Sequence, residues 1–392
     1  LLLGSQRDFD YLGDDAIRAA EVEDGRLILR GEEYRAVVIS PVTVMAVDVM
    51  AKLAEFVRSG GVLVLCGEFP VQAVITGSDA ELADILGSLI ADPGRGVFAR
   101  VPSVSDVLAA LEPVAPDVIL DPVHDTINYL HRRVGETDIY FLANRDVEPH
   151  VFVAEFRSSG DPSFWNAEDA TLAPVNEYQR VDGCTMIPLE LPGYGSKYIV
   201  FTPGAERPHV VGANLHKVLS VTAESVKAYA RHTGAFYADV QAGEDIIRRY
   251  ATVASIPASI DLKSKWTLAK EGESEAVPIH LGDWAQQGYA DFSGSATYSI
   301  EVELGTEYLN RPLLLELGWV RESAEVLVNG RTAGTRIWYP YTVEIGPLVR
   351  EGKNLVEVIV TNTLGNRLQG QPFESGLIGP VRIVPLEEVE LK

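Results

Sequence analysis

The stretch from Leu317 to Asn366 restricts the fold of this chain more than any other segment. It reads as consecutive antiparallel strands with their turns included. Residues 325–328 run into Asn329-Gly330, a dipeptide that tolerates the positive φ angles of a tight hairpin. In residues 355–360, valines then recur at every second position, Val356, Val358 and Val360, which is the period of a half-buried strand. Short strands at this spacing predict a β-sandwich or jelly roll.

Three segments of this stretch resemble a known module. Residues 324–330 (AEVLVNG), 338–340 (WYP) and 358–362 (VIVTN) are similar to a galactose-binding-like jelly roll. That module is the sugar-binding domain of glycoside hydrolase family 2 and its relatives. Residues 362–368 (NTLGNRL) resemble more narrowly the C-terminal part of α-L-rhamnosidase-like enzymes of glycoside hydrolase family 106.

The composition is that of a globular chain and disfavours two classes of partner. Hydrophobic residues make up 46% of the sequence, enough to bury a core. The formal net charge of -23 disfavours nucleic acid and anionic membranes, because phosphate binding needs concentrated Lys and Arg. No apolar run approaches the ~20 residues that a membrane span needs. We therefore expect a soluble chain with no nucleic-acid partner and no membrane span.

The two cysteines and the N-terminal residues bear on processing. Cys66 and Cys184 give neither a disulfide framework nor a metal signature, so both are expected to be free thiols. Residues 1–4 (LLLG) show no initiator Met and no basic region, so they are not a signal peptide. We interpret the chain as a fragment that lacks its N-terminal part and any targeting region, which leaves its localisation unknown.

Residues 1–112 predict an α/β domain of the flavodoxin/amidotransferase-like kind. An apolar run at 37–39 predicts a strand buried on both faces, residues 44–58 show helical spacing, and 62–65 predict a second buried strand. Such a βαβ unit is right-handed with parallel strands. The segment resembles class I glutamine amidotransferases, in which Cys66 would be the nucleophile. Since Cys66 lacks the glycine two residues before it that makes a tight elbow, a core thiol in a degenerate domain is favoured.

Residues 113–260 predict a β-sandwich. A hairpin over 125–145 contains His131, Arg132 and Arg133, and resembles a segment of the same rhamnosidase-like family. These side chains could bind sugar hydroxyls, but acidic residues nearby in the sequence favour structural ion pairs. Residues 224–231 fit either a helix or a strand.

Residues 261–392 predict the jelly roll, in which 313–317 is expected to pair with the alternating strand over 298–304. Sugar recognition uses aromatic faces against the C–H side of a ring, with Asn and Arg for the hydroxyls. The carbohydrate-binding candidates of these types are Trp284, Trp338, Tyr339, Asn366 and Arg367. A sandwich core and its turns require the same residue types. Trp338 and Tyr339 are favoured because they lie in a loop, although this module often only packs against a barrel.

Catalysis is expected to lie outside the chain. Glycoside hydrolysis needs two carboxylates about 5–5.5 Å or 6.5–9.5 Å apart, and 56 acidic residues single out no pair. The resemblance implies catalytic glutamates, and calcium, on an N-terminal (β/α)₈ barrel. We therefore expect no catalytic residue, no metal site and no cofactor in this chain.

The resemblance implies the C-terminal accessory region of a glycoside hydrolase that acts on α-L-rhamnosides, inactive without its missing barrel. Its partners would be that barrel and, through the parent enzyme, a rhamnose-containing glycan. A free-standing carbohydrate-binding or adhesion protein without catalysis is the alternative. An amidotransferase-like enzyme working through Cys66 is a third hypothesis.

Overall fold

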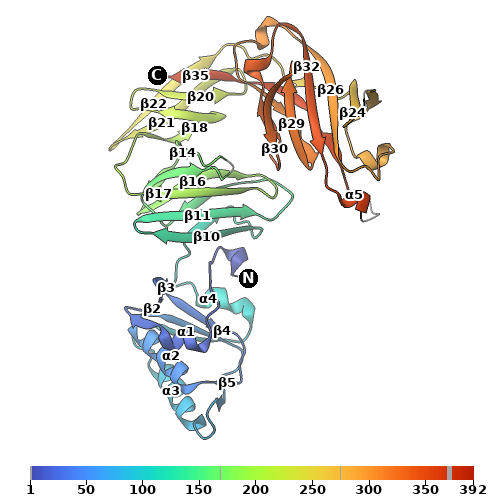
Figure 1. Cartoon of the computed structure of the whole chain (residues 1–392). Coiled ribbons are helices and arrows are strands. Elements are labelled where there is room, and N and C mark those ends of the chain that lie inside the picture. Colours follow the sequence, from blue (N-terminus) through green and yellow to red (C-terminus); the bar gives the residue numbers. More distant parts are fainter. Residues whose placement is uncertain (1, 168, 274, 369–372) are drawn as a thin grey trace. The chain divides into compact units, whose positions relative to one another are not determined.

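The computed structural model describes residues 2–167, 169–273, 275–368 and 373–392 (Figure 1). Strands form most of its regular structure. The chain divides into two compact units, residues 1–131 and 132–392. The domain boundaries expected at 112/113 and 260/261 stay predictions.

The first unit contains a three-stranded parallel sheet with helices. The sheet has the order β4-β6-β8, with β4 at Ala36–Ile39, β6 at Val62–Cys66 and β8 at Val97–Val101. All five residues of β6 are buried, as expected for a strand with neighbours on both sides. The strand predicted at β4 is present and parallel to β6, but its predicted burial on both faces was wrong: β4 is an edge strand, none of its residues is fully buried, and Val38 is 36% exposed.

Helix α2 (Val47–Ser59) supplies much of the core of this unit. Val49, Leu53, Phe56 and Val57 recur at helical spacing and are buried. The helix begins three residues later than predicted, because Val44–Met45 forms the short strand β5. The other elements are α1 (Asp14–Ala19), β1 (Glu21–Glu23), β2 (Arg26–Leu29), β3 (Glu32–Tyr34), β7 (Gln72–Ala73), α3 (Asp79–Ala91), α4 (Val107–Ala110) and β9 (Val118–Asp121).

The second unit begins with two antiparallel sheets that share an aromatic core. Tyr140, Phe156 and Phe201 contact one another with ring centres 4.9 to 5.7 Å apart, and all three are buried. They come from three different strands, which fixes the packing of the sheets. The strands are β10 (Ile127–Val134), which crosses the boundary between the units, β11 (Thr137–Asn144), β12 (His150–Phe156), β13 (Asp161–Trp165), β14 (Leu172–Pro174), β15 (Gln179–Val181), β16 (Cys184–Leu191) and β17 (Ser196–Thr202).

Two three-stranded sheets follow, and the end of the chain completes one of them. The first has the order β18-β21-β22 and the second β19-β20-β35. Residues 224–231, left open by the sequence, contain the strand β20. Phe236, Val226 and Leu391 lie in their shared core. The strands are β18 (His209–Ala213), β19 (Lys217–Val221), β20 (Val226–Ala230), β21 (Gly234–Ala242), β22 (Asp245–Val253) and β35 (Glu387–Leu391).

The remaining strands form a C-terminal sandwich. A six-stranded sheet, β25-β24-β26-β32-β29-β30, and a four-stranded sheet, β23-β34-β27-β31, contribute to one buried core. The hairpin predicted at Asn329-Gly330 is present, with φ angles of 54° and 75°. The bounds are β23 (Ile260–Asp261), β24 (Trp266–Lys270), β25 (Val277–Ile279), β26 (Ser295–Leu304), β27 (Leu313–Glu316), β28 (Trp319–Arg321), β29 (Ser323–Val328), β30 (Arg331–Arg336), β31 (Thr342–Glu344), β32 (Gly352–Thr361), α5 (Gly365–Leu368), β33 (Gly376–Gly379) and β34 (Arg382–Pro385).

The strand pairing within this sandwich differs from the sequence prediction at β27. This strand pairs with β31 and β34, whereas β26 pairs with β24 and β32. The alternation of apolar residues was correct, because the inward residues of both strands are buried. An alternating pattern predicts which side chains face a core but not which strand lies alongside, so β27 was assigned to the wrong sheet.

Candidate functional site

An aromatic platform lies on the C-terminal sandwich. Trp319 of β28 and Tyr339 stack with ring centres 4.7 Å apart and planes inclined by 26°. The guanidinium carbon of Arg321 lies 5.2 Å from the centre of the Trp319 ring, close enough for cation–π attraction. Glu374 fixes this arginine by accepting a hydrogen bond of 2.9 Å from its Nε. We call Trp319, Arg321 and Tyr339 the Trp319 platform.

The two loop residues favoured by the sequence have different surroundings. Trp338 is 54% exposed, so much of its ring is open to solvent. Tyr339 is half-buried; burial raises the pKa of its hydroxyl, and the nearby carboxylates of Glu190 and Glu316 raise it further. Tyr339 therefore keeps its proton at neutral pH and can donate a hydrogen bond. This loop offers an open ring face and a neutral hydroxyl.

Trp284, another predicted sugar contact, is a core residue. It is fully buried, and its Nε1 donates a hydrogen bond of 2.6 Å to the hydroxyl of Tyr298. The same hydroxyl accepts a second hydrogen bond from the backbone of Leu377. Phe292 packs edge-on against the indole at 5.3 Å. Because the whole Trp284 ring is covered by neighbouring residues, a sugar cannot stack on it, and Trp284 stabilises the core of the sandwich instead.

Asn366 and Arg367 are neighbours with opposite exposure. Asn366 is buried, and its Nδ2 donates to the carbonyl of Phe373 at 2.8 Å and to the hydroxyl of Ser375 at 3.2 Å. Asn362 reaches the same hydroxyl at 3.1 Å, so both amides tie chain segments together. Arg367 is exposed, and its backbone N–H donates to Ser293. Among the predicted residues, Trp338, Tyr339 and Arg367 are therefore the accessible ones.

The sequence missed Arg321 as part of the platform. Trp319 and Arg321 stand two residues apart on β28, and side chains at this spacing project from the same face of a strand. From this spacing, the sequence could have predicted that Arg321 lies beside Trp319. The stacking partner Tyr339 could not be found in this way, because it reaches Trp319 from a separate loop.

The cysteines and His131 were also singled out by the sequence, and of these Cys66 and His131 lie in the first unit and Cys184 in the second. Cys66 is a free thiol at the end of β6, 4% exposed, and burial raises its pKa. A nucleophilic cysteine needs a lowered pKa and access to solvent, so Cys66 is a core thiol. Cys184 is also a free thiol. His131 lies 2.9 Å from a carboxylate oxygen of Asp117, a structural pair of the kind that the sequence favoured.

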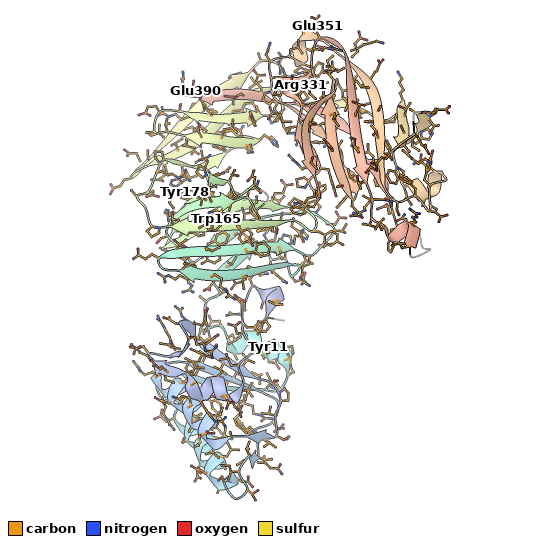
Figure 2. All side chains as sticks on the ribbon, viewed as in Figure 1. Tyr11, Trp165, Tyr178, Arg331, Glu351 and Glu390 are labelled. Atoms are coloured by element: carbon orange, nitrogen blue, oxygen red, sulfur yellow. The ribbon has the colours of Figure 1, made fainter. Side chains whose placement is uncertain are left out.

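A polar hollow of about 450 Å³ lies in the second unit. Tyr178, which is labelled in Figure 2, contacts one of the residues that line it. His209, one of its lining residues, stacks on Tyr178 with ring centres 3.8 Å apart and planes inclined by 8°. No single sequence pattern indicated this hollow, because its walls come from separate strands and loops. They are Gln179, Arg180, Glu206, His209, Val211, Gln241 and Ile246.

Glu177 is the carboxyl group closest in character to a catalytic acid. It is half-buried, and burial raises its pKa. A general acid of a glycosidase has a raised pKa but faces a second carboxylate. Burial is the whole cause of the shift at Glu177, and no neighbouring charge contributes within the described residues. The raised pKa of Glu177 therefore gives no indication of a second carboxylate beside it.

Within residues 2–167, 169–273, 275–368 and 373–392, no three His, Cys, Asp or Glu side chains gather closely enough to hold a metal ion. In the same residues, no helix has the length and apolar character required to cross a membrane.

Comparisons with known proteins relate this chain to glycoside hydrolases of more than one kind. A family model described as alpha-L-rhamnosidase matches residues 3–180. A Formosa agariphila protein named "Putative beta-glucuronidase" is 34% identical over 149 residues, which cover 34% of this chain and 13% of that protein. A solved rhamnosidase from Novosphingobium sp. PP1Y has a TM-score of 0.63 and 24% identity, over 99% of this chain and 36% of that one. This last similarity shows the fold, and the chain spans little more than a third of that enzyme.

Proposed function

The chain resembles an α-L-rhamnosidase-like glycoside hydrolase, and on this premise we propose that it is the C-terminal accessory region of an enzyme acting on α-L-rhamnosides. The proposed catalytic barrel, and any calcium that it needs, lie outside these 392 residues. The accessory region supports the barrel or contacts the glycan. The observation that carries the proposal is the match to 99% of this chain but only 36% of the rhamnosidase.

We assign specific folds to the parts of this region as part of the proposal. The C-terminal sandwich is a galactose-binding-like jelly roll, and the parallel sheet of the first unit is a degenerate amidotransferase-like domain. Two sheets contributing to one core support the first assignment. The buried Cys66, with its raised pKa, supports the loss of a nucleophile in the second.

The proposed sugar contact on the jelly roll is Trp338 together with Tyr339. Trp338 presents an exposed ring, which is the surface that stacks on the C–H side of a sugar. The neutral Tyr339 hydroxyl and the guanidinium of Arg321 are donors of the kind that bind sugar hydroxyls. Arg367 is an accessible donor as well.

The decisive experiment is hydrolysis of 4-nitrophenyl α-L-rhamnopyranoside by this chain and by the longer protein from its parent gene. We expect hydrolysis by the longer protein and none by the 392-residue chain. Hydrolysis by this chain alone would overturn the proposal. If the longer protein is also inactive but the chain binds neutral glycans, the alternative holds, a carbohydrate-binding or adhesion protein without catalysis.

A further inference from the structure

The outer face of the sheet β18-β21-β22 carries ordered side chains to which the proposed function gives no role. Phe236, Ala238 and Val240 of β21 point into the core and are buried. Tyr237, Asp239 and Gln241 alternate with them and therefore point outward. Their partners on β22, by register, are Tyr250, Arg248 and Ile246. We call these six residues the outer β21–β22 face.

The centre of this face is held by a charge pair. Arg248 donates two hydrogen bonds to Asp239, from Nε to Oδ1 at 2.6 Å and from Nη2 to Oδ2 at 2.7 Å. Its guanidinium carbon also lies 4.6 Å from the centre of the Tyr237 ring. Arg248 lowers the pKa of Asp239, so the pair stays ionised and its charges cancel at neutral pH. A guanidinium has five N–H donors, and two bonds leave others for a ligand.

Large apolar side chains flank this pair. Tyr250 is 62% exposed and Ile246 is 61% exposed, both on β22. Tyr250 stands directly opposite Tyr237, so two aromatic residues lie side by side across the strands. Ile246 and Gln241 also line the polar hollow of about 450 Å³, so the face and the hollow are continuous.

The side chains of His209, Gln179 and Gln241 supply hydrogen-bond acceptors to the hollow. His209 is 1% exposed, and its Nδ1 lies 3.0 Å from the carbonyl oxygen of Arg207. A carbonyl only accepts, so Nδ1 carries the proton. Burial lowers the pKa of this histidine, which keeps the ring neutral and leaves Nε2 as an acceptor. Gln179 and Gln241 donate through Nε2 to carbonyls of Val211 and Gly243, which leaves their Oε1 atoms as further acceptors.

The charges in the hollow are paired, like those on the face. Nε of Arg180 lies 3.3 Å from Oε1 of Glu206. That Nε is buried and makes no hydrogen bond to any described residue. The two other nitrogens of Arg180 donate to the carbonyls of Ser159 and Gly160, so the guanidinium is rigidly placed.

We infer that the outer β21–β22 face and the adjoining hollow bind a neutral oligosaccharide. One ring would lie against Tyr250, beside the Arg248–Tyr237 contact, and another would enter the hollow beside His209. Paired charges suit an uncharged ligand, whereas an anion would require unpaired arginines. The hollow lies in the range of ligand pockets, roughly 300–1,000 Å³. This site is separate from the Trp338 contact and does not depend on a catalytic role for the parent protein.

The test begins with the full 392-residue chain on an array of immobilised neutral and acidic oligosaccharides. Calorimetric titration with the neutral oligosaccharide that gives the strongest signal follows. We expect binding to a neutral oligosaccharide, about tenfold weaker in Tyr250→Ala, since about 1.4 kcal/mol of lost stacking corresponds to that factor. Ile246→Arg, which places a bulky charge at the hollow, should abolish the binding.

Matched controls separate a local effect from a general one. Tyr11→Ala removes a tyrosine that is 93% exposed in the first unit, and Val151→Arg changes a valine that is 70% exposed on β12. Both controls should bind like the unchanged chain. Absence of binding to every neutral oligosaccharide would overturn the inference. Binding that survives Tyr250→Ala and Ile246→Arg but is lost in Trp338→Ala would also overturn it, while supporting the sugar contact proposed on the jelly roll.

Discussion

Arg231 and Glu316 join two sheets of the second unit through a hydrogen bond of 2.6 Å between Nη2 and Oε1. Arg231 directly follows β20, and Glu316 ends β27 of the C-terminal sandwich. The second carboxylate oxygen of Glu316 accepts from Nε of Arg382, also at 2.6 Å. The largely buried carboxylate of Glu316 therefore binds two arginines, Arg231 next to β20 and Arg382 on β34.

We predict that Glu316→Gln destabilises the second unit by about 1 kcal/mol. An exposed ion pair contributes about 0.2–1 kcal/mol, and Glu316, with a side chain only 19% exposed, serves two partners. The measurement is urea unfolding of Glu316→Gln, Arg231→Ala and the double variant. A coupling energy indistinguishable from zero would contradict the prediction. Lys263→Ala is the control, because the Lys263–Asp261 pair is largely exposed and should change stability by less than about 0.5 kcal/mol.

We predict a larger loss of stability when the C-terminal strand β35 is altered. Leu391 of β35 is fully buried, and β35 pairs with β20 over five residues. Leu391→Ala should destabilise the sheets β18-β21-β22 and β19-β20-β35 by about 2–5 kcal/mol, the range for a leucine removed from a core. Hydrogen exchange of the β20 amides should accelerate, while exchange in β26 should change little. Lys392→Ala, with an exposed side chain, is the matched control, and equal exchange in both variants would contradict the prediction.

The sequence predicted local structure well where one pattern dominates. Val49, Leu53 and Phe56 recur at helical spacing, and the helix α2 is present. Asn329-Gly330 predicted a hairpin whose φ angles are those of a tight turn. Failures came where distant segments decide the outcome. Val37 to Ile39 looks like a central strand, yet it lies at a sheet edge because β6 has β8 as its other neighbour.

The candidate site was less predictable for the same reason. Trp284 follows the polar Asp283 and Trp338 follows the apolar Ile337 in the sequence, yet Trp284 is fully buried and Trp338 is 54% exposed. The burial of the two tryptophans differs because Trp284 is enclosed by residues of other elements, among them Tyr298 on β26, whose hydroxyl accepts a hydrogen bond from the indole. The hollow beside His209 is likewise formed by residues from separate segments, so no single stretch of sequence could predict it.

A third prediction is that substitution of Trp284 lowers stability, whereas substitution of Trp338 lowers sugar binding. Trp284→Phe removes the hydrogen bond to Tyr298 and should lower the free energy of unfolding of the C-terminal sandwich by about 1–3 kcal/mol. Trp338→Ala, at an exposed ring, should change it by less than about 0.5 kcal/mol. Binding of methyl α-L-rhamnopyranoside, measured by calorimetry, should be weakened only by Trp338→Ala. Weaker binding in a fully folded Trp284→Phe variant would contradict the assignment of Trp284 to the core.

The buried thiol predicts a dependence of stability on pH. Burial raises the pKa of Cys66 in the folded chain, whereas an unfolded thiol titrates near its ordinary value of about 8.5. Above that pH the unfolded state has lost a proton that the folded state keeps. The folded state then binds more protons, so the stability of the first unit should fall as pH rises from about 8 to 10. Urea unfolding of the chain and of Cys66→Ala measures this, and the variant should lose part of the decline.

Thiol reactivity checks the same burial independently. In a Cys184→Ser background, Cys66 should react with a disulfide reagent about 100-fold more slowly in the native chain than in urea, because attack requires opening of the buried strand β6. Cys184, which is half-exposed, should react faster than Cys66 when the reciprocal Cys66→Ala variant is tested. A native Cys66 that reacts as fast as a free thiol would contradict its place in the core. Such a result would also restore it as a candidate nucleophile.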